Sequence, residues 1–141
     1  MKLKNEKFFA GKTWEQVFKD LNFEKHYEKL CKKLSNKKVM LYGAGIMFEF
    51  FVKNYDLSKL NIVGIADKKF EIKETNKYKN FNALKPKELP NTDFDFIIIT
   101  TQYPVMIRNI IKREIFKNKK CPPIYFLLNK PFMLYLEEIW N

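Results

Sequence analysis

A glycine turn between two apolar runs constrains the fold of this chain more than any other feature. Residues 39–42 form a short apolar run that ends at Gly43-Ala44-Gly45, and a helix-forming segment separates them from a second apolar run, residues 62–66. Short apolar runs bounded by turn residues are typical of buried strands. A strand, a tight turn, a helix and a second strand make one βαβ unit, in which the two strands are parallel and helices cover the sheet.

The turn and the end of the second run together predict a site for a nucleotide. Two glycines let the backbone turn sharply and approach a ligand closely, and the amides at the following helix N-terminus point at an anion such as a phosphate. Asp67 follows the second run directly, where a carboxylate can accept hydrogen bonds from ribose hydroxyls. We expect Gly43, Ala44, Gly45 and Ile46 to contact the phosphate through their backbone, and Asp67 to bind the ribose.

Phe48 departs from the dinucleotide fingerprint. That pattern places a third glycine three residues after the second, because close packing of the helix on the strand leaves no room for a side chain; here the position is Phe48. We expect the phenylalanine to push the helix outward or to alter the turn. NAD(P) seated as in ordinary dehydrogenases is therefore disfavoured, although it stays among the alternatives.

A second group of candidate site residues follows a later strand. The segment FIIIT, residues 96–100, is typical of a strand buried on both faces. Thr100, Thr101 and Gln102 lie at its carboxyl end, where open α/β sheets place ligand contacts. Their side chains can meet a base, sugar or phosphate, and capping of a helix that begins near Pro104 is an equal alternative.

The remaining segments fit an α/β, Rossmann-like three-layer fold with a mostly parallel sheet. A capping box at Thr13 and Gln16 predicts a helix from Trp14, and the apolar stripe changes phase after Asn22, which indicates a kink or two short helices. The remaining predicted elements are a loop at 68–77, a third strand and a helical turn within 78–89, an amphipathic helix at 105–117 and a last strand at 124–128. We expect an N-terminal helical extension (1–36), a Rossmann-like nucleotide-binding core (37–128) and a C-terminal docking segment (129–141), partly helical and rich in aromatic residues.

Charge and composition narrow the classes of partner and setting. The net charge is +11, but 25 of the 27 basic residues are lysines and only Arg108 and Arg113 can make bidentate contacts. The sequence contains no recognisable nucleic-acid module, so it argues against nucleic acid as a partner. Two cysteines without a metal spacing, no signal peptide and no apolar stretch of spanning length favour a cytoplasmic protein.

No catalytic set or metal cluster stands out. His26 is the only histidine and has no neighbouring acid or second ligand in the sequence, so we expect a surface or edge-of-core position for it. Catalytic residues therefore stay unassigned, and no metal is expected.

Four segments carry a resemblance to a known group of domains: LYGAG (41–45), IVGIAD (62–67), YKNFNALKPKEL (78–89) and FDFIIIT (94–100). The core resembles the N-terminal domain of bacterial sugar O- or N-acyltransferases of the sialic-acid and bacillosamine type, and the similar domain of nucleotide-sugar dehydratases. The resemblance implies a UDP- or CMP-sugar as ligand and a role in surface polysaccharide biosynthesis. Acyl transfer would need a separate protein, because the chain has no hexapeptide repeats.

Two alternatives to a nucleotide-sugar domain stay open. The first is a small methyltransferase that binds S-adenosylmethionine, because such enzymes also place a glycine turn and a strand-end acid around an adenosine. The second is an assembly module without a ligand. In either case the aromatic N- and C-terminal segments are candidates for contact with a second copy of the chain or with a partner enzyme.

Overall fold

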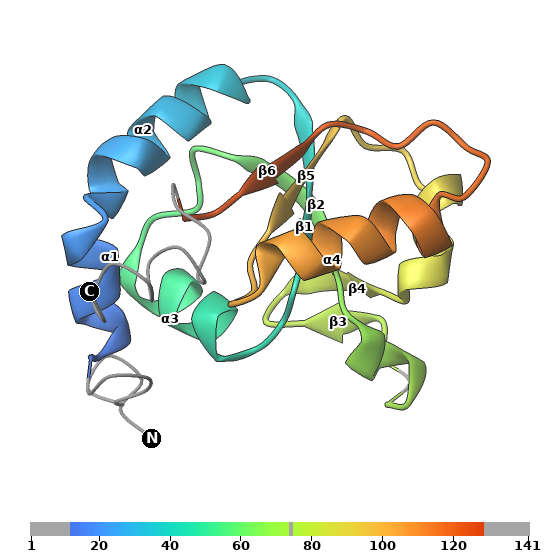
Figure 1. The fold of residues 1–141 in the computed structure, drawn as a ribbon, viewed down its shortest axis with the longest axis horizontal. Coiled ribbons are helices and arrows are strands. Elements are labelled where there is room, and N and C mark those ends of the chain that lie inside the picture. The colour runs from blue at the N-terminus through green and yellow to red at the C-terminus, as the bar shows by residue number, and fades with distance from the viewer. Residues whose placement is uncertain (1–11, 74, 129–141) are drawn as a thin grey trace.

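The structure is a computed structural model, and it describes residues 12–73 and 75–128 of the chain. It has a Rossmann-like α/β fold in which helices cover both faces of a six-stranded sheet (Figure 1). The strand order is β3-β4-β2-β1-β5-β6, and every neighbouring pair is parallel except β3 with β4. The strands are β1 (Lys38–Tyr42), β2 (Asn61–Ala66), β3 (Lys77–Tyr78), β4 (Phe81–Leu84), β5 (Phe96–Ile99) and β6 (Ile124–Phe126).

The order of the strands places a topological switch point between β1 and β5. From β1 the chain moves outward through β2 to β4, and it then returns to the other side of β1 to form β5 and β6. Ligands of open α/β sheets bind outside the carboxyl ends of the strands at such a point. The glycine turn after β1 and the segment after β5 therefore lie next to each other.

Two hydrophobic clusters lie on opposite faces of the sheet and make up the core. On one face, α1 (Trp14–Asp20), α2 (Phe23–Lys33) and α3 (Ile46–Asn54) pack aromatic side chains against the strands. On the other face, aliphatic side chains of β5 meet α4 (Pro104–Ile110) and two shorter elements, η4 (Pro86–Asn91) and η5 (Ile111–Ile115). The central strand β1 is buried on both faces, as a parallel strand between helix layers should be.

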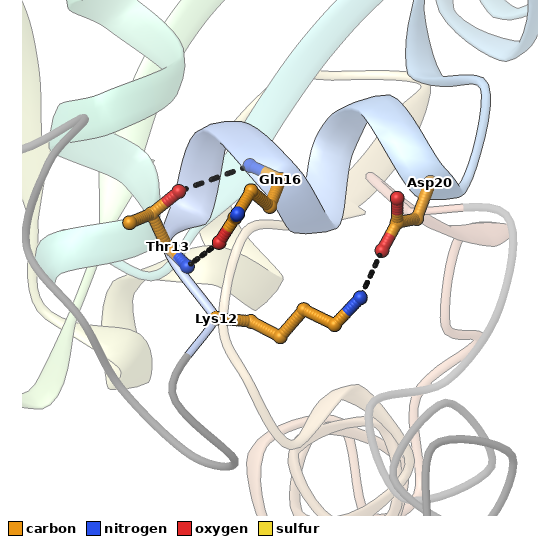
Figure 2. Close-up of polar contacts among 4 residues, drawn as sticks. All are labelled: Lys12, Thr13, Gln16 and Asp20. Atoms are coloured by element: carbon orange, nitrogen blue, oxygen red, sulfur yellow. Dashed lines mark hydrogen bonds and ion pairs between the residues drawn. The ribbon is translucent and has the colours of Figure 1, made fainter.

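The predicted start of the first helix is confirmed. Thr13 accepts a hydrogen bond from the Gln16 amide, and the Gln16 side chain accepts one from the Thr13 amide (Figure 2). Lys12 and Asp20 form an ion pair of 2.9 Å beside this capping box. The change of phase is also confirmed, because Asn22 adopts a left-handed conformation between α1 and α2 (φ 52°).

The segment after β2 differs from its prediction in two respects. Residues 68–77 begin with a 3-10 turn, η3 (Lys68–Glu71), where a loop without helix was expected. In place of a single third strand, the chain forms a hairpin of two short strands, β3 and β4. Lys79 and Asn80 form the turn of this hairpin, with positive φ angles of 49° and 69°. Two left-handed residues are typical of the tight turns that match strand twist, and asparagine tolerates this conformation.

The predicted helix at 105–117 begins one residue earlier, at Pro104, and ends in the π-helical turn η5. The predicted docking segment 129–141 lies outside the described residues, and the division into three segments stays a prediction. Within residues 12–73 and 75–128, no helix is long and apolar enough to cross a membrane.

Candidate functional site

Gly43 is required by the fold. Its φ of +122° is one that other residues rarely adopt, and a Cβ atom at this position would lie 2.4 Å from the Thr101 Cγ2 atom. The backbone carbonyl group of Thr100 would also be only 3.1 Å away. Gly43 therefore allows the end of β5 to pack directly against the end of β1.

Gly45 is open on its outer side. It is the N-cap residue of α3, its φ is −97°, and no side chain caps the helix there. A Cβ atom at Gly45 would meet nothing within 4 Å. The amides of the first helical turn have no intrahelical partners, so this end of α3 presents hydrogen-bond donors beside unoccupied space.

In the peptide between Gly43 and Ala44, both the N–H and the carbonyl group form hydrogen bonds with side chains. The Ala44 amide donates to Asp67 Oδ2 at 2.7 Å, and the buried Thr100 hydroxyl donates to the Gly43 carbonyl oxygen at 2.6 Å. Asp67 and Thr100 follow the two strands that flank β1. The carboxyl ends of β2 and β5 thus fix the first half of the turn.

In the next peptide, between Ala44 and Gly45, only the carbonyl group forms a hydrogen bond within the described residues. The Lys69 ammonium donates to the Ala44 carbonyl oxygen and, at 3.3 Å, to the Tyr78 hydroxyl. Tyr78 in turn donates to Glu49 Oε1 at 2.7 Å. Burial, followed by this bond to Glu49, raises the pKa of Tyr78, so the hydroxyl keeps its proton at neutral pH.

Asp67 has structural partners that the sequence did not suggest. Besides the Ala44 amide, its carboxylate accepts the Lys69 amide at 2.9 Å and so caps η3. Each carboxylate oxygen has a second lone pair. The predicted contact with a ribose stays a prediction, and it would add to these bonds rather than replace them.

Thr100 and Thr101 differ in their hydroxyl groups. The Thr100 hydroxyl binds the glycine turn, whereas Thr101 Oγ1 is buried without a hydrogen-bond partner among the described residues. Helix capping by these residues is wrong, because the N-cap of α4 is Tyr103 and no side chain caps it. Thr101 lines a recess that is too tightly packed to hold a water molecule, together with Met47, Ile99, Gln102, Pro104, Phe126, Leu127 and Leu128.

Several exposed apolar side chains come after the carboxyl ends of strands. The large hydrophobic residues with the most exposed surface in the described part of the chain all follow carboxyl strand ends: Ile46 after β1, Ile72 after β2, and Tyr103, Val105 and Met106 after β5. Ile72 is 89% exposed. Ligand sites usually combine such apolar surface with a few polar groups.

Phe48 is fully buried and turned toward the β3–β4 hairpin. Its ring centroid lies 6.0 Å from that of Tyr78 and 6.1 Å from that of Phe81. The space between α3 and the hairpin thus takes up the bulk of the ring, and the open face at Gly45 is left clear.

His26 lies at the edge of the core, as expected. Its Nε2 atom is 3.5 Å from the Phe126 carbonyl oxygen, and burial lowers its pKa below the usual value. In the described ranges, no three His, Cys, Asp or Glu side chains form a group that could hold a metal ion.

Sequence reasoning missed Lys69, Tyr78 and Glu49 as parts of the site. Lys69 follows Asp67 by two residues, but it is one of 25 lysines and nothing in the sequence distinguishes it. Tyr78 and Glu49 meet only because the hairpin folds against α3. A search for polar residues directly after Asp67 in the sequence could have found Lys69 but not its partners Tyr78 and Glu49.

Three solved structures of RSP, which is described as a Rex-family repressor, are similar to this chain. The complex of RSP with β-NAD+ and operator DNA is 17% identical, with a TM-score of 0.47 over 92% of this chain and 74% of that chain. A second structure of RSP is 16% identical, with a TM-score of 0.43, and the match covers 93% of this chain and 78% of that chain. The complex with β-NADH is 18% identical, with a TM-score of 0.42 over 93% and 77%. At these values the likeness concerns the fold alone.

Two expectations change with these comparisons. The argument from sequence against nucleic acid as a partner does not stand, because one of these structures is a complex with operator DNA. That DNA is a ligand of RSP and is not assigned to this chain. The resemblance to sugar acyltransferases and nucleotide-sugar dehydratases is confirmed only as far as the Rossmann-like fold. Its finer part, the link to those enzymes, is not supported.

A search of proteins with curated functions found no match. The sequence model of a protein family does match, over residues 35–121, which include every strand from β1 to β5 and the whole glycine turn. This range is more than half of the chain, and the chain therefore belongs to the family described as C2185-like, N-terminal.

Proposed function

We propose that this chain binds a nucleotide through its phosphate at the N-terminus of α3. The observation that carries the proposal is the open face at Gly45, where an uncapped helix end borders empty space. Helix N-termini attract anions because their amides lack intrahelical partners and the helix dipole is positive there. The phosphate would meet the backbone of Gly45 and Ile46, which are exposed. The amides of Gly43 and Ala44 were also predicted to bind it, but they already donate to Ala66 and Asp67.

The groups around the turn suit the rest of a nucleotide. Asp67 has lone pairs left for ribose hydroxyls, and Thr101 has a buried hydroxyl that needs a partner. Ile46 and Ile72 offer exposed aliphatic surface for a base. Gln102 follows β5 on the far rim.

The packing at the switch point favours a mononucleotide portion over a dinucleotide. The recess beside Thr101 has no space for even a water molecule, whereas ligand pockets usually measure roughly 300–1,000 Å³. The second half of a dinucleotide would have to displace side chains there. A UDP- or CMP-sugar, and with it a role in surface polysaccharide synthesis, is therefore the finer hypothesis, with NAD(P) and S-adenosylmethionine as the comparison ligands.

Thermal shift and calorimetry with UDP-sugars, CMP-sugars, NAD(H), S-adenosylmethionine and acetyl-CoA test this proposal. A ligand at a hundred times its dissociation constant raises the free energy of unfolding by about 2.7 kcal/mol. The blocking variant is Gly45→Trp, which fills the open face. The control is Ser58→Trp, an exposed position before β2 at the opposite edge of the sheet.

We expect one nucleotide class to stabilise the wild type and Ser58→Trp, but not a folded Gly45→Trp protein. The ligand class would then name the substrate. If none of these compounds stabilises the wild type, the nucleotide proposal fails, and an assembly module without a ligand becomes the better account.

A further inference from the structure

The hydrogen bond of the Ala44 carbonyl group shows how the peptide between Ala44 and Gly45 is oriented. In a trans peptide the carbonyl and the following N–H point in opposite directions, and the described residues contain no cis peptide bond. The Ala44 carbonyl oxygen accepts the Lys69 ammonium. The Gly45 N–H therefore points away from Lys69.

Three of the four polar groups in the two turn peptides are already paired. Asp67 accepts the Ala44 N–H, Thr100 donates to the Gly43 oxygen, and Lys69 donates to the Ala44 oxygen. The fourth group, the Gly45 N–H, has no hydrogen-bond acceptor among the residues that the structure describes. Gly45 itself is exposed, and a Cβ atom on it would meet nothing within 4 Å.

Lys69 is itself held in place for this contact. Its own amide is bound by Asp67 at 2.9 Å, its ammonium lies 4.3 Å from the centroid of the Tyr78 ring, and the Tyr78 hydroxyl is fixed by Glu49. An exposed lysine with no such partners loses much rotamer freedom when it is ordered. The surrounding groups reduce that cost by restricting the ammonium to the Ala44 carbonyl.

We infer that Lys69 is a positioning residue that orients the Gly45 amide toward the ligand, with Tyr78 and Glu49 holding Lys69 in place. The inference rests on the proposed nucleotide site and adds the residue that prepares it. The ligand group recognised by the Gly45 amide is an anion, the phosphate of the nucleotide. Lys69 acts on it through the peptide group, by binding the carbonyl oxygen at the edge opposite the Gly45 N–H.

The test compares Lys69→Met with Lys68→Met. Both variants remove one exposed lysine charge from neighbouring positions of η3. Unlike Lys69, the Lys68 side chain forms no hydrogen bond, ion pair or ring contact within the described residues. The first readout is the ¹⁵N-resolved amide signal of Gly45 in the protein without ligand, which is tractable because the chain has only 4 glycines. The second readout is the dissociation constant of UDP, used as the probe.

We expect the Gly45 signal to shift and broaden in Lys69→Met, since the peptide is no longer held, and to stay as in the wild type in Lys68→Met. UDP should bind at least about tenfold more weakly to Lys69→Met, the effect of losing a charge-assisted hydrogen bond. Lys69→Arg, which keeps a charged donor, should recover part of the affinity. If Lys69→Met does not fold, Tyr78→Phe removes the hydroxyl that contacts Lys69 at 3.3 Å and the Ala44 carbonyl oxygen at 3.4 Å. It should give a smaller change of the same kind.

An unchanged Gly45 signal and unchanged UDP affinity in Lys69→Met would overturn the inference while leaving the nucleotide site intact. Equal losses in Lys68→Met and Lys69→Met would also overturn it, because charge alone would then explain both. Failure of UDP to bind the wild type would count against the proposed function, and the Gly45 signal without ligand would still decide the role of Lys69.

Discussion

Gly43 and Gly45 lie two residues apart in one turn, yet their surroundings are opposite. A side chain at Gly43 would collide with Thr101 at 2.4 Å, whereas one at Gly45 would meet nothing within 4 Å. The backbone of Gly43 is left-handed, but that of Gly45 is accessible to any residue. The first glycine therefore serves the packing of β1 against β5, and the second leaves space for a ligand.

The largest effect should come from Gly43→Ala. The positive φ and the close backbone of Thr100 together should cost about 3 kcal/mol or more in the free energy of unfolding. Chemical denaturation measures this change. A loss below about 1 kcal/mol would mean that the turn can relax, and the contrast between the glycines would weaken.

Alkaline pH should destabilise the folded protein through Tyr42, the last residue of β1 before the glycine turn. Burial, and then the charge of Asp67, raises the pKa of Tyr42 from 10.0 to about 12. Above pH 10 the unfolded chain loses this proton while the folded protein keeps it, so stability falls as pH rises toward 12. A fall of about 2 kcal/mol is expected from this group.

Denaturation at a series of alkaline pH values gives the slope of that fall. The slope should be smaller in Tyr42→Phe. The remainder includes the other groups whose pKa values burial raises, namely Tyr27, Tyr55, Tyr78, Cys31 and Cys121. Equal slopes in both proteins would show that Tyr42 ionises as readily in the folded state as in the unfolded one.

Thr100→Val should destabilise the protein by about 1–2 kcal/mol, because the buried Gly43 carbonyl loses its side-chain donor. The two side chains have nearly the same shape, so packing should change little. Urea denaturation measures the loss. A neutral result would indicate that water or another donor replaces the hydroxyl.

Gly45→Ser should separate stability from binding. Serine is a good N-cap residue and φ of −97° suits it, so the free energy of unfolding should stay within about 0.5 kcal/mol or rise. The hydroxyl would compete with phosphate for the helix amides, and nucleotide affinity should fall about tenfold. Unchanged affinity by calorimetry would place the ligand elsewhere.

The smallest effect is expected for Thr101→Val. It removes a buried hydroxyl without a partner in the described structure, so stability should be unchanged or rise by up to about 1 kcal/mol. Thermal denaturation of this variant beside Thr100→Val is the check. A marked loss would reveal an acceptor for Thr101 beyond the described residues.

Local patterns in the sequence predicted much of this arrangement. The βαβ unit, the capping box at Thr13 and the change of phase at Asn22 follow from spacing and turn chemistry within a few residues. The sequence also predicted a helix that begins at the glycine turn, although it gave Gly43 and Gly45 the same role. The turn of the β3–β4 hairpin was harder, since Lys79 and Asn80 adopt positive φ angles without a glycine.

The contacts that hold the turn could not be predicted from the sequence. Lys69 reaches Ala44 across 25 residues and Tyr78 reaches Glu49 across 29, and such pairs depend on how the hairpin packs on α3. Asp67 was assigned to a ligand on the strength of its position, although the fold first uses it for the Ala44 and Lys69 amides. A strand-end acid can serve the turn and a ligand together, and only the structure shows the first role.

The central claim is that a nucleotide phosphate binds beside Gly45. The most direct measurement is a titration of the ¹⁵N-labelled wild-type protein with UDP, followed through the amide signals of its glycines. The account predicts that the Gly45 signal shifts most and that the signal of Gly64, which lies inside β2, hardly moves. A titration in which UDP leaves the Gly45 signal unmoved would contradict it.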